Sequence, residues 1–476
     1  MAELDKNDIL IILYTISNML RFVGLAMIVP VIVSLIYGEW LYTEVFTLMG
    51  LGLFVIFTFV RNYSGKKQTR MKHAIISIAL AWFIIGVISS IPFLFNNITP
   101  IDAFFESVSG WSGTGLSMIS SPENLPFSLN FWRGFIQWMG GFGIVLLALL
   151  FYEKPDTALN LFAAEGRNEE FYSNVKRVAR TILTIYFVYT LIGVVLFLFS
   201  GLSLFDAVFH SFTSIATGGF STNSVGVGYY GPTAMGVTII LMLLGGISFE
   251  SHHDLFKGRI RKFFAGPELR FFLGVIVAAT ILLCINFYFF KDAAYFDGFF
   301  YIVSAITGTG ATSFVAIDSM PALAVFVLIL LMIFGACYGS TTGALKIWRI
   351  LILFKVIRRE IHKAFLPQHS IVPLKIGDRI ISDEAALKAL SYMVLYVFVL
   401  ILGSIIFMLF GFGAIESIFT VASAQGNVGL SFLGGSEWYS MTPFLKFLLS
   451  LHMILGRMEI LPFLILIKSM GFGSRI

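Results

Sequence analysis

The stretch TSIATGGFSTN, residues 213–223, contains little that a membrane helix would bury, yet it lies between two long hydrophobic runs. The chain around it is strongly apolar: 58% of its 476 residues are hydrophobic, only 12% are charged, and its mean hydropathy is +0.89. Crossing the hydrocarbon core of a bilayer takes about 20 apolar residues. The sequence therefore predicts an all-α integral membrane protein with ten transmembrane helices, at approximately residues 9–36, 43–60, 73–96, 129–152, 178–201, 231–256, 271–291, 321–345, 389–412 and 441–469.

The basic residues are concentrated in three segments, 61–72, 257–262 and 346–363, whereas the connections 95–131 and 201–232 contain no Lys or Arg. By the positive-inside rule the basic segments are cytoplasmic, which places both termini inside. The net charge of +5 then reflects membrane topology, so we expect a lipid bilayer and no nucleic acid as its surroundings. The first run is too long for a secretory signal and lacks a small-residue cleavage site, so we expect it in the mature protein.

One pattern occurs four times in a common register, which indicates internal repeats. An acidic residue is followed three positions later by Phe, ten positions further by Gly, and then by an apolar residue and Ser or Thr. We therefore expect an additional N-terminal hairpin at 1–72 and four tandem helix/pore-loop/helix repeats at 73–177, 178–270, 271–388 and 389–476. The four sets are Asp102, Phe105, Gly115, Leu116 and Ser117; Asp206, Phe209, Gly219, Phe220 and Ser221; Asp297, Phe300, Gly310, Ala311 and Thr312; and Glu416, Phe419, Gly429, Leu430 and Ser431.

In each repeat we expect a spanning helix, a half-length helix, a glycine-containing extended segment and a second spanning helix. The basic segments fall between repeats, so the half-length helices enter the membrane from outside. Thr99 and Ser203 are expected as their N-caps, with Pro100 in a first helical turn. Non-helical backbone at membrane depth must be buried in protein or line a watery cavity. Four such segments around one central ion pore satisfy both conditions.

Glycine permits backbone conformations that aim successive carbonyl oxygens at an axis, where they replace the water shell of a cation. The alternative is that these glycines are close-packing points in a helix bundle. A shared register in four re-entrant segments favours a selectivity filter. Its expected residues are Ser112, Gly113, Thr114, Gly115, Ala216, Thr217, Gly218, Gly219, Gly308, Thr309, Gly310, Gln425, Gly426, Asn427, Val428 and Gly429.

These segments resemble the pore loops of the Trk/Ktr/HKT superfamily of potassium transporters, and within it the TrkH type. The resemblance covers nearly the whole chain, through FFESVSGWSGTGLS, FHSFTSIATGGFSTN, ITGTGATSF and SAQGNVGLSF, and through FGACYGSTTGALKIWRI and LGRMEILPFLIL in the later repeats. The hairpin at about 9–60 favours TrkH over the shorter Ktr subunits. The resemblance implies a prokaryotic plasma-membrane protein, a filter that binds the transported K+ ions and no other metal or cofactor, a homodimer, and a cytoplasmic TrkA-like ring of nucleotide-binding regulatory subunits.

Two other classes of function are open to this sequence. A secondary transporter, such as a K+/H+ or K+/Na+ symporter, also uses broken helices and internal repeats, but its repeats are inverted or twofold. An intramembrane hydrolase would need a nucleophile and a base at matching depth, and no catalytic motif is present. The segment SHHD, residues 251–254, falls where a helix reaches the cytoplasm, so we interpret it as a surface or interhelical contact. We expect no enzymatic activity.

The segment GACYGSTTGALK, residues 335–346, interrupts the second helix of the third repeat with glycines and poor helix formers. Its register places it just inside the filter, so we predict an intramembrane gating loop, which the TrkH resemblance also implies. The competing interpretation is helix packing, because the three glycines are spaced by four. The expected gate residues are Gly335, Gly339, Ser340, Thr341, Thr342, Gly343 and, on the fourth repeat, Arg457.

Arg457 is a charge in an otherwise apolar helix, and intramembrane charges are usually functional. We predict that it presents a positive barrier to K+ beneath the filter. The alternative is a salt bridge to Glu459 or Glu250. The longest polar connections, 153–177 and 358–385, are cytoplasmic by charge, and we predict that they dock the regulatory ring.

Overall fold

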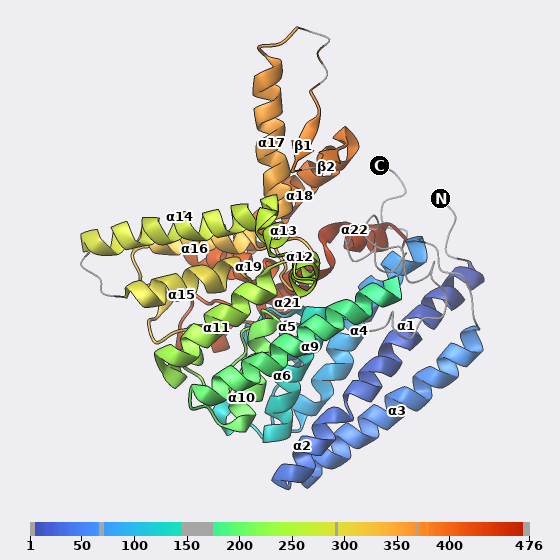
Figure 1. Ribbon diagram of the computed structural model, residues 1–476. Helices are drawn as coiled ribbons and strands as arrows, with labels where there is room; N and C mark the ends of the chain where they lie inside the picture. Colours follow the sequence, from blue (N-terminus) through green and yellow to red (C-terminus); the bar gives the residue numbers. More distant parts are fainter. Residues whose placement is uncertain are drawn as a thin grey trace.

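The computed structural model describes residues 5–65, 71–143, 175–290, 294–367, 370, 372–377 and 379–469. Within these residues the protein is helical apart from its loops and one two-stranded hairpin (Figure 1). Seven helical segments are long and apolar enough to cross a bilayer, which makes it a multi-pass membrane protein. They are Lys6–Tyr37, Trp40–Ser64, Lys72–Leu94, Ala179–Phe199, Val227–Gly246, Pro267–Phe290 and Asp383–Leu409.

The N-terminal part is a helical hairpin in which α1 (Lys6–Ala26), continued by α2 (Val29–Tyr37), lies beside α3 (Trp40–Ser64) (Figure 1). Asp5 caps α1 by accepting a hydrogen bond from the Asp8 N–H at 2.6 Å. The Asp8 carboxylate in turn accepts one from Lys72 Nζ at 2.7 Å, on α4 (Met71–Leu94). This contact fastens the hairpin to the rest of the molecule at one end of α1.

Four short helices each follow a long one. They are α5 (Pro100–Ser112) after α4, α10 (Leu204–Ile215) after α9 (Val175–Phe199), α15 (Tyr295–Ile306) after α14 (Pro267–Phe290), and α19 (Ala414–Gln425) after α18 (Asp383–Leu409). The predicted caps are confirmed: Thr99 accepts from the Asp102 N–H at 3.3 Å and Ser203 from the Asp206 N–H at 3.1 Å. An oxygen cap satisfies one of the free N–H groups of the first turn.

The helices that follow the short ones are α6 (Phe127–Phe142), α11 (Gly231–Gly246), α16 (Ala322–Phe334) and α21 (Pro443–Met458). Helices α11 and α21 end earlier than expected. The expectation of unbroken spans at 231–256 and 441–469 was wrong. Ser248 caps a new helix, α12 (Phe249–Phe256), and Glu459 adopts a left-handed conformation (φ +65°) before α22 (Ile460–Ser469). Residues 144–152 of the fourth expected span lie outside the described residues.

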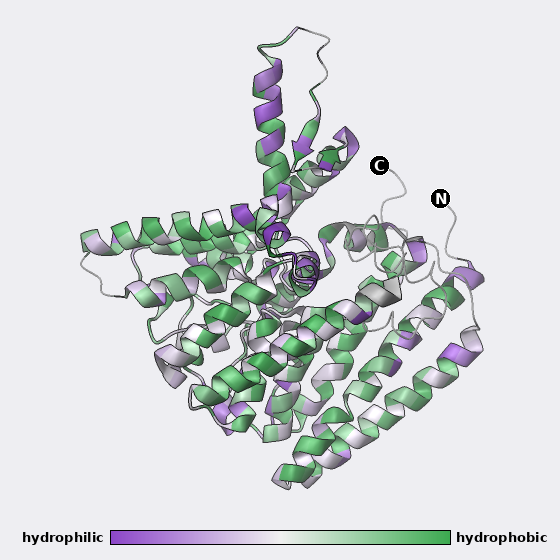
Figure 2. Ribbon diagram, in the orientation of Figure 1, coloured by the Kyte–Doolittle hydropathy of each residue, from purple (hydrophilic) through white to green (hydrophobic). Residues whose placement is uncertain are grey.

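The break after α16 falls where it was predicted. After α16 the chain is non-helical from Gly335 to Lys346 and then continues as α17 (Ile347–Lys363). Helix α17 projects away from the other helices, beside the antiparallel strands β1 (Leu374–Ile376) and β2 (Arg379–Ile381) (Figure 1). The outer part of α17 is hydrophilic, whereas the main body is largely hydrophobic (Figure 2). Shorter helices α13 (Ile260–Ala265) and α20 (Gly435–Tyr439) complete the elements, with 3-10 turns at Pro122–Asn124, Val227–Tyr230 and Ile317–Ser319.

Helices α1 and α3 approach each other at two glycines, and this contact yields a testable prediction. A Cβ at Gly50 would lie 2.9 Å from Gly24 O, whereas a Cβ at Gly52 would meet nothing within 4 Å. We expect Gly50→Ala to destabilise the protein by about 1–3 kcal/mol, the usual cost of overpacking. The matched control Gly52→Ala should be neutral or stabilising by up to about 1 kcal/mol, because Ala is the better helix former.

The measurement is thermal unfolding of the purified protein in detergent. A melting temperature that falls for Gly50→Ala and not for Gly52→Ala supports the close approach. Equal melting temperatures for the two variants would contradict it.

Candidate functional site

The four glycine-containing loops form a closed ring. A Cβ at Gly115, in the first loop, would lie 2.1 Å from the carbonyl oxygen of Gly218 in the second. The other three junctions are alike. At each, the ring glycine of one loop lies against the carbonyl oxygen of the residue that precedes the ring glycine of the next loop. The other three contacts are Gly219 with Thr309 O at 1.9 Å, Gly310 with Val428 O at 1.9 Å, and Gly429 with Thr114 O at 2.1 Å. The fourth loop thus returns to the first.

The backbone of the four loops follows one conformation. Every ring glycine has a positive φ, between +71° and +99°. The residue two positions earlier also has a positive φ, between +51° and +68°, in Gly113, Thr217, Gly308 and Asn427. The residue between them donates its N–H to a carbonyl five positions back, over 2.8–2.9 Å, in the pairs Thr114–Ser109, Gly218–Thr213, Thr309–Ser304 and Val428–Ser423. A left-handed residue other than glycine is uncommon and marks a backbone held by its surroundings. Each loop is therefore anchored to the end of its own short helix.

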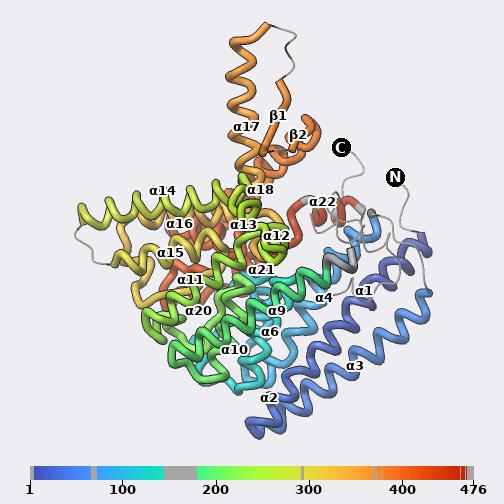
Figure 3. Tube along the Cα trace, viewed as in Figure 1, coloured from blue at the N-terminus to red at the C-terminus, as the bar shows by residue number. Residues whose placement is uncertain are grey.

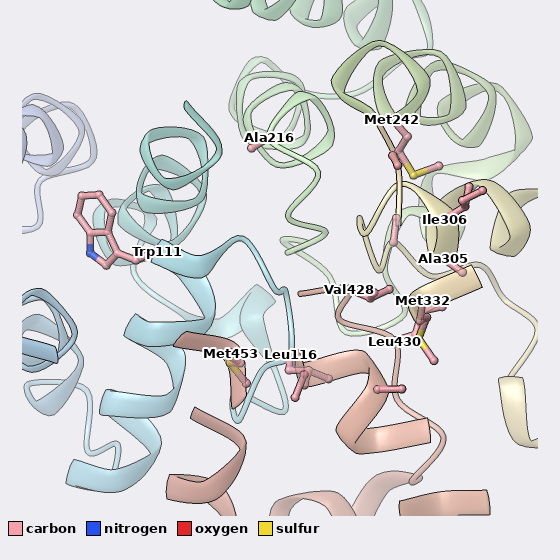
Figure 4. Packing of buried hydrophobic residues seen from close by; sticks show 14 of the residues in the cluster. Trp111, Leu116, Ala216, Met242, Ala305, Ile306, Met332, Val428, Leu430 and Met453 are labelled. Atoms are coloured by element: carbon pink, nitrogen blue, oxygen red, sulfur yellow. The ribbon is translucent and has the colours of Figure 1, made fainter. Parts of the chain in front are cut away.

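Adjacent loops differ in the side chains that support them. In the first and third loops, hydroxyl pairs lie beside the backbone, Ser112–Thr114 at 2.6 Å and Thr307–Thr309 at 2.7 Å. In the fourth, Asn427 Nδ2 donates to Thr114 Oγ1 at 2.9 Å and so joins two loops. Figure 4 shows Leu116, Val428 and Leu430 where loops from distant parts of the chain come together.

The second loop is held by a residue that the sequence analysis missed. Gln137, on α6, donates from Nε2 to Gly218 O at 2.6 Å and accepts the Phe220 N–H at 3.1 Å. A carbonyl oxygen has two lone pairs, so Gly218 O retains a second site for another partner. The side chain of Gln425, an expected filter residue, contacts α18, because its amide donates to Tyr396 O at 2.8 Å.

The segment 335–346 is buried among all of these parts. Thr341 Oγ1 donates to Gly245 O at 3.0 Å and lies 2.8 Å from Thr217 Oγ1 of the second loop. A Cβ at Gly343 would lie 2.5 Å from Asn427 Oδ1 of the fourth loop. Ser340, Thr341 and Thr342 are each no more than 5% exposed. The predicted gate segment therefore lies directly against two of the predicted filter loops.

At Tyr338 and Gly339 this segment is also held by α14 and α12. The Glu268 carboxylate accepts the Tyr338 N–H, and Phe249 donates its N–H to Gly339 O at 3.1 Å. Glu250, next to Phe249, pairs with Arg379 of β2 at 3.1 Å. Burial raises the pKa of Glu250 above its ordinary value, and the Arg379 charge opposes that rise. The β-hairpin is thus one contact away from the residues that hold the segment.

Arg457 lies at the end of α21 and contacts both segment 335–346 and α6. Its guanidinium donates to the carbonyl oxygens of Thr341 and Gly140, and to Gly141 O at 3.2 Å. Of the two acids considered as its partners, Glu459 pairs with Arg349 at 2.5 Å and Glu250 with Arg379. Arg457 therefore connects segment 335–346 to α6, a set of backbone partners that sequence reasoning did not identify.

The SHHD segment forms part of α12 and makes interhelical contacts. His252 is buried, with its ring nitrogens 2.9 Å from Tyr189 Oη and 2.8 Å from Leu244 O. Asp254 pairs with Lys262 at 3.1 Å. Among the described residues, no group of three or more His, Cys, Asp or Glu side chains could hold a metal ion.

The fold and the loop ring define a polytopic helical membrane protein with backbone oxygens gathered at its centre. Residues 46–471 match the TrkH family model, described as a cation transport protein. The chain is 33% identical, over 99% of its length and 98% of the relative's, to an uncharacterised cation transporter of Methanocaldococcus jannaschii. It is 31% identical, over 94% of its length and 97% of the relative's, to the Trk system potassium uptake protein TrkH of Escherichia coli K12.

The fold also matches a solved structure. The crystal structure of the potassium transporter TrkH from Vibrio parahaemolyticus covers 98% of this chain and 99% of its own with a TM-score of 0.86, at 24% identity. The chain belongs to the TrkH family of cation transport proteins. The resemblance found in the loop sequences is thereby confirmed, and so is the expectation of a transporter and not an enzyme.

Proposed function

We propose that this protein is a potassium uptake protein in which the four loops form the selectivity filter of a single channel-like pore. The observation that carries the proposal is the closed ring, in which each loop's glycine lies against the carbonyl of the next loop. Rings of backbone carbonyls select cations by replacing their hydration shell. The relatives named as potassium uptake proteins favour K+ as the ion. The same ring supports the arrangement of four pore repeats around one axis, which we propose within the expected set of ten spanning helices.

The proposed selectivity filter is tested first, by a substitution at Gly219. Gly219 has φ +74°, and a Cβ there would lie 1.9 Å from Thr309 O, so a side chain must displace the neighbouring carbonyl. We expect Gly219→Ser to lower the K+/Na+ permeability ratio by about tenfold or more, because selectivity depends on the number and placement of the carbonyl dipoles. Gly236→Ser, whose added Cβ would meet nothing within 4 Å, is the matched control.

The measurement is flux of K+, Rb+ and Na+ in proteoliposomes, with reversal potentials from bilayer recording. Wild-type protein should pass K+ and Rb+ better than Na+, with a reversal potential that follows the K+ gradient. A permeability ratio unchanged by Gly219→Ser would contradict the filter, and coupling of K+ to a proton or Na+ gradient would favour the symporter.

We propose further that segment 335–346 and Arg457 form the gate. The segment has polar contacts to the second loop and lies against the fourth, and Arg457 fastens its centre to α6. A cation that leaves the filter toward the cytoplasm would meet a positive charge and a plug of backbone. Non-helical backbone at this depth is stable because polar protein groups satisfy it, so its release needs a new set of partners or water.

Shortening segment 335–346 distinguishes a gating role of the segment from a role in helix packing. We expect deletion of Ser340–Thr342, and separately Arg457→Ala, to raise Rb+ uptake by about tenfold, which corresponds to a barrier lowered by about 1.4 kcal/mol. A Cys at Thr341, which is 1% exposed, should become labelled by a charged thiol reagent from the cytoplasmic side only when the regulator is in its activating state. Variants that fold and conduct no more than wild type, with Thr341→Cys always protected, would contradict the gate.

The assembly that we propose is a homodimer in a prokaryotic plasma membrane, with both termini cytoplasmic and a TrkA-like nucleotide-binding ring docked on the same side. The beginning of α1, helix α22 and the α17 projection lie toward the upper side of the view (Figures 1 and 3). Of the two expected docking connections, 358–385 includes the hydrophilic end of α17 and the β-hairpin, whereas 153–174 lies outside the described residues.

Docking is tested by co-purification with a candidate nucleotide-binding ring. We expect retention of the ring to fall to background when the connection 358–385 is replaced by a neutral linker of equal length, because its charged side chains would be lost. Replacement of 118–126, in an opposite connection, by the same type of linker should leave retention unchanged. Equal retention for both variants would place the docking surface elsewhere.

A further inference from the structure

A fully buried ion pair lies directly behind the first two loops. Arg133 Nε donates to Glu106 Oε1 at 2.7 Å, and the two side chains are 1% and 0% exposed. Glu106 belongs to the short helix α5 and Arg133 to α6. Removing two charges from water is expensive, and such a pair contributes little net stability compared with apolar residues of the same volume. Its presence therefore needs a reason other than stability.

The remaining polar atoms of the pair are directed at the loops. Ser117 Oγ donates to the Glu106 carboxylate at 3.0 Å and accepts from Arg133 Nη2 at 3.2 Å. Arg133 Nη1 donates to Ser221 O at 3.3 Å and to Asn130 Oδ1 at 2.9 Å. Its guanidinium also lies 4.5 Å from the centre of the Phe220 ring.

These contacts fall at equivalent places in two loops. Ser117 lies two residues beyond the ring glycine of the first loop, and Ser221 two residues beyond that of the second. The Met118 N–H also donates to Glu106, at 3.1 Å. One planar guanidinium thus contacts both loops just beyond the ring. The fixed fork of an Arg side chain sets direction as well as distance, which an ammonium group does not.

The other junctions in the ring use different contacts. Positions equivalent to Glu106 are occupied by His210, Tyr301 and Thr420, and those equivalent to Arg133 by Thr238, Leu328 and Leu449. Between the second and third loops, the Gly228 N–H donates to Thr312 O at 3.1 Å. Between the fourth repeat and the first loop, Trp438 Nε1 donates to Ser117 O at 2.7 Å. Among these equivalent positions, the charged pair occurs only at the first junction.

We infer that Glu106 and Arg133 are positioning residues that set the spacing of the first and second loops and thereby the ion selectivity of the ring. The inference rests on the proposed filter function. Neither side chain has to touch the permeating ion. The pair acts through Ser117, Ser221 and the Phe220 ring, and it fixes the Gly115–Gly218 junction from behind.

The test compares conservative variants of the pair with a matched ion pair on the same helix. Glu106→Gln keeps the shape of the side chain and removes its charge, and Arg133→Lys keeps the charge and removes the fork. Lys446→Met breaks the Lys446–Asp102 pair, a 2.6 Å contact at the outer end of α5. Ser117→Ala, which removes one hydroxyl between the two charges, serves if the charge variants accumulate poorly.

The readout is the K+/Na+ permeability ratio in proteoliposomes, beside the melting temperature of each variant. Glu106→Gln leaves Arg133 as an uncompensated buried charge, and Arg133→Lys loses the planar fork that contacts both loops, so each variant should lower the ratio by about tenfold. Losing one hydrogen bond in Ser117→Ala should lower it about threefold. Lys446→Met should lower the melting temperature and change the ratio less than about twofold, since its contact lies outside the loops.

Gly219→Ser is measured in parallel. If Gly219→Ser shifts the ratio and the variants of the pair change only the melting temperature, the pair is structural and the inference is overturned while the filter stands. If Gly219→Ser leaves the ratio unchanged, the filter proposal itself fails. A ratio lowered equally by Lys446→Met would show a general loss of packing around α5 and would also overturn the inference.

Discussion

The close approach of a carbonyl oxygen to a glycine of the neighbouring loop is the constraint on which the centre of this molecule depends. At each of the four junctions a Cβ would fall 1.9–2.1 Å from that oxygen, so only glycine permits the loops to meet. Close contacts between a glycine and a carbonyl oxygen also occur where three of the second helices meet the ends of the short helices. Gly140, Gly245 and Gly456 lie against Trp111 O, Ile215 O and Gln425 O, each at the end of a short helix. Two layers of backbone contact therefore hold the short helices and the loops in one arrangement.

The third repeat departs from this second layer, and the departure explains the shape of the segment 335–346. Gly335 lies against Ala344 of the same segment, because the chain turns back on itself after α16. The turn brings the Thr341 hydroxyl to Thr217 and presents the Thr341 carbonyl oxygen to Arg457. Contacts from the second and fourth repeats thus meet at the third repeat, whose second helix is interrupted by this loop. Such a segment changes conformation only when several contacts are exchanged together.

Much of this arrangement follows from local sequence. The caps Thr99 and Ser203, the positions of the four glycines and the break after Phe334 all have short-range causes: an oxygen before a helix, a residue without a Cβ, and a run of poor helix formers. The breaks at 247–248 and at Glu459 were not predicted, because each occupies only one or two residues inside an apolar run.

The partners of the buried polar residues were also beyond sequence reasoning. Gln137 and Gly218 are far apart in the chain, as are Arg457 and Gly140, and no spacing rule relates a side chain to a backbone carbonyl of another repeat. Glu106 and Arg133 are visible as charges in apolar surroundings, but only the packing of α5 against α6 brings them together. A sequence pattern identifies such residues as unusual, and the fold decides what they contact.

The most direct test of the carbonyl ring is a crystal structure of the protein grown in Rb+, with anomalous scattering measured at the rubidium absorption edge. The account predicts an anomalous peak on the central axis, encircled by the loops that carry Gly115, Gly219, Gly310 and Gly429. Ordered loops with no peak on that axis, or a Rb+ ion bound only elsewhere in the molecule, would contradict it.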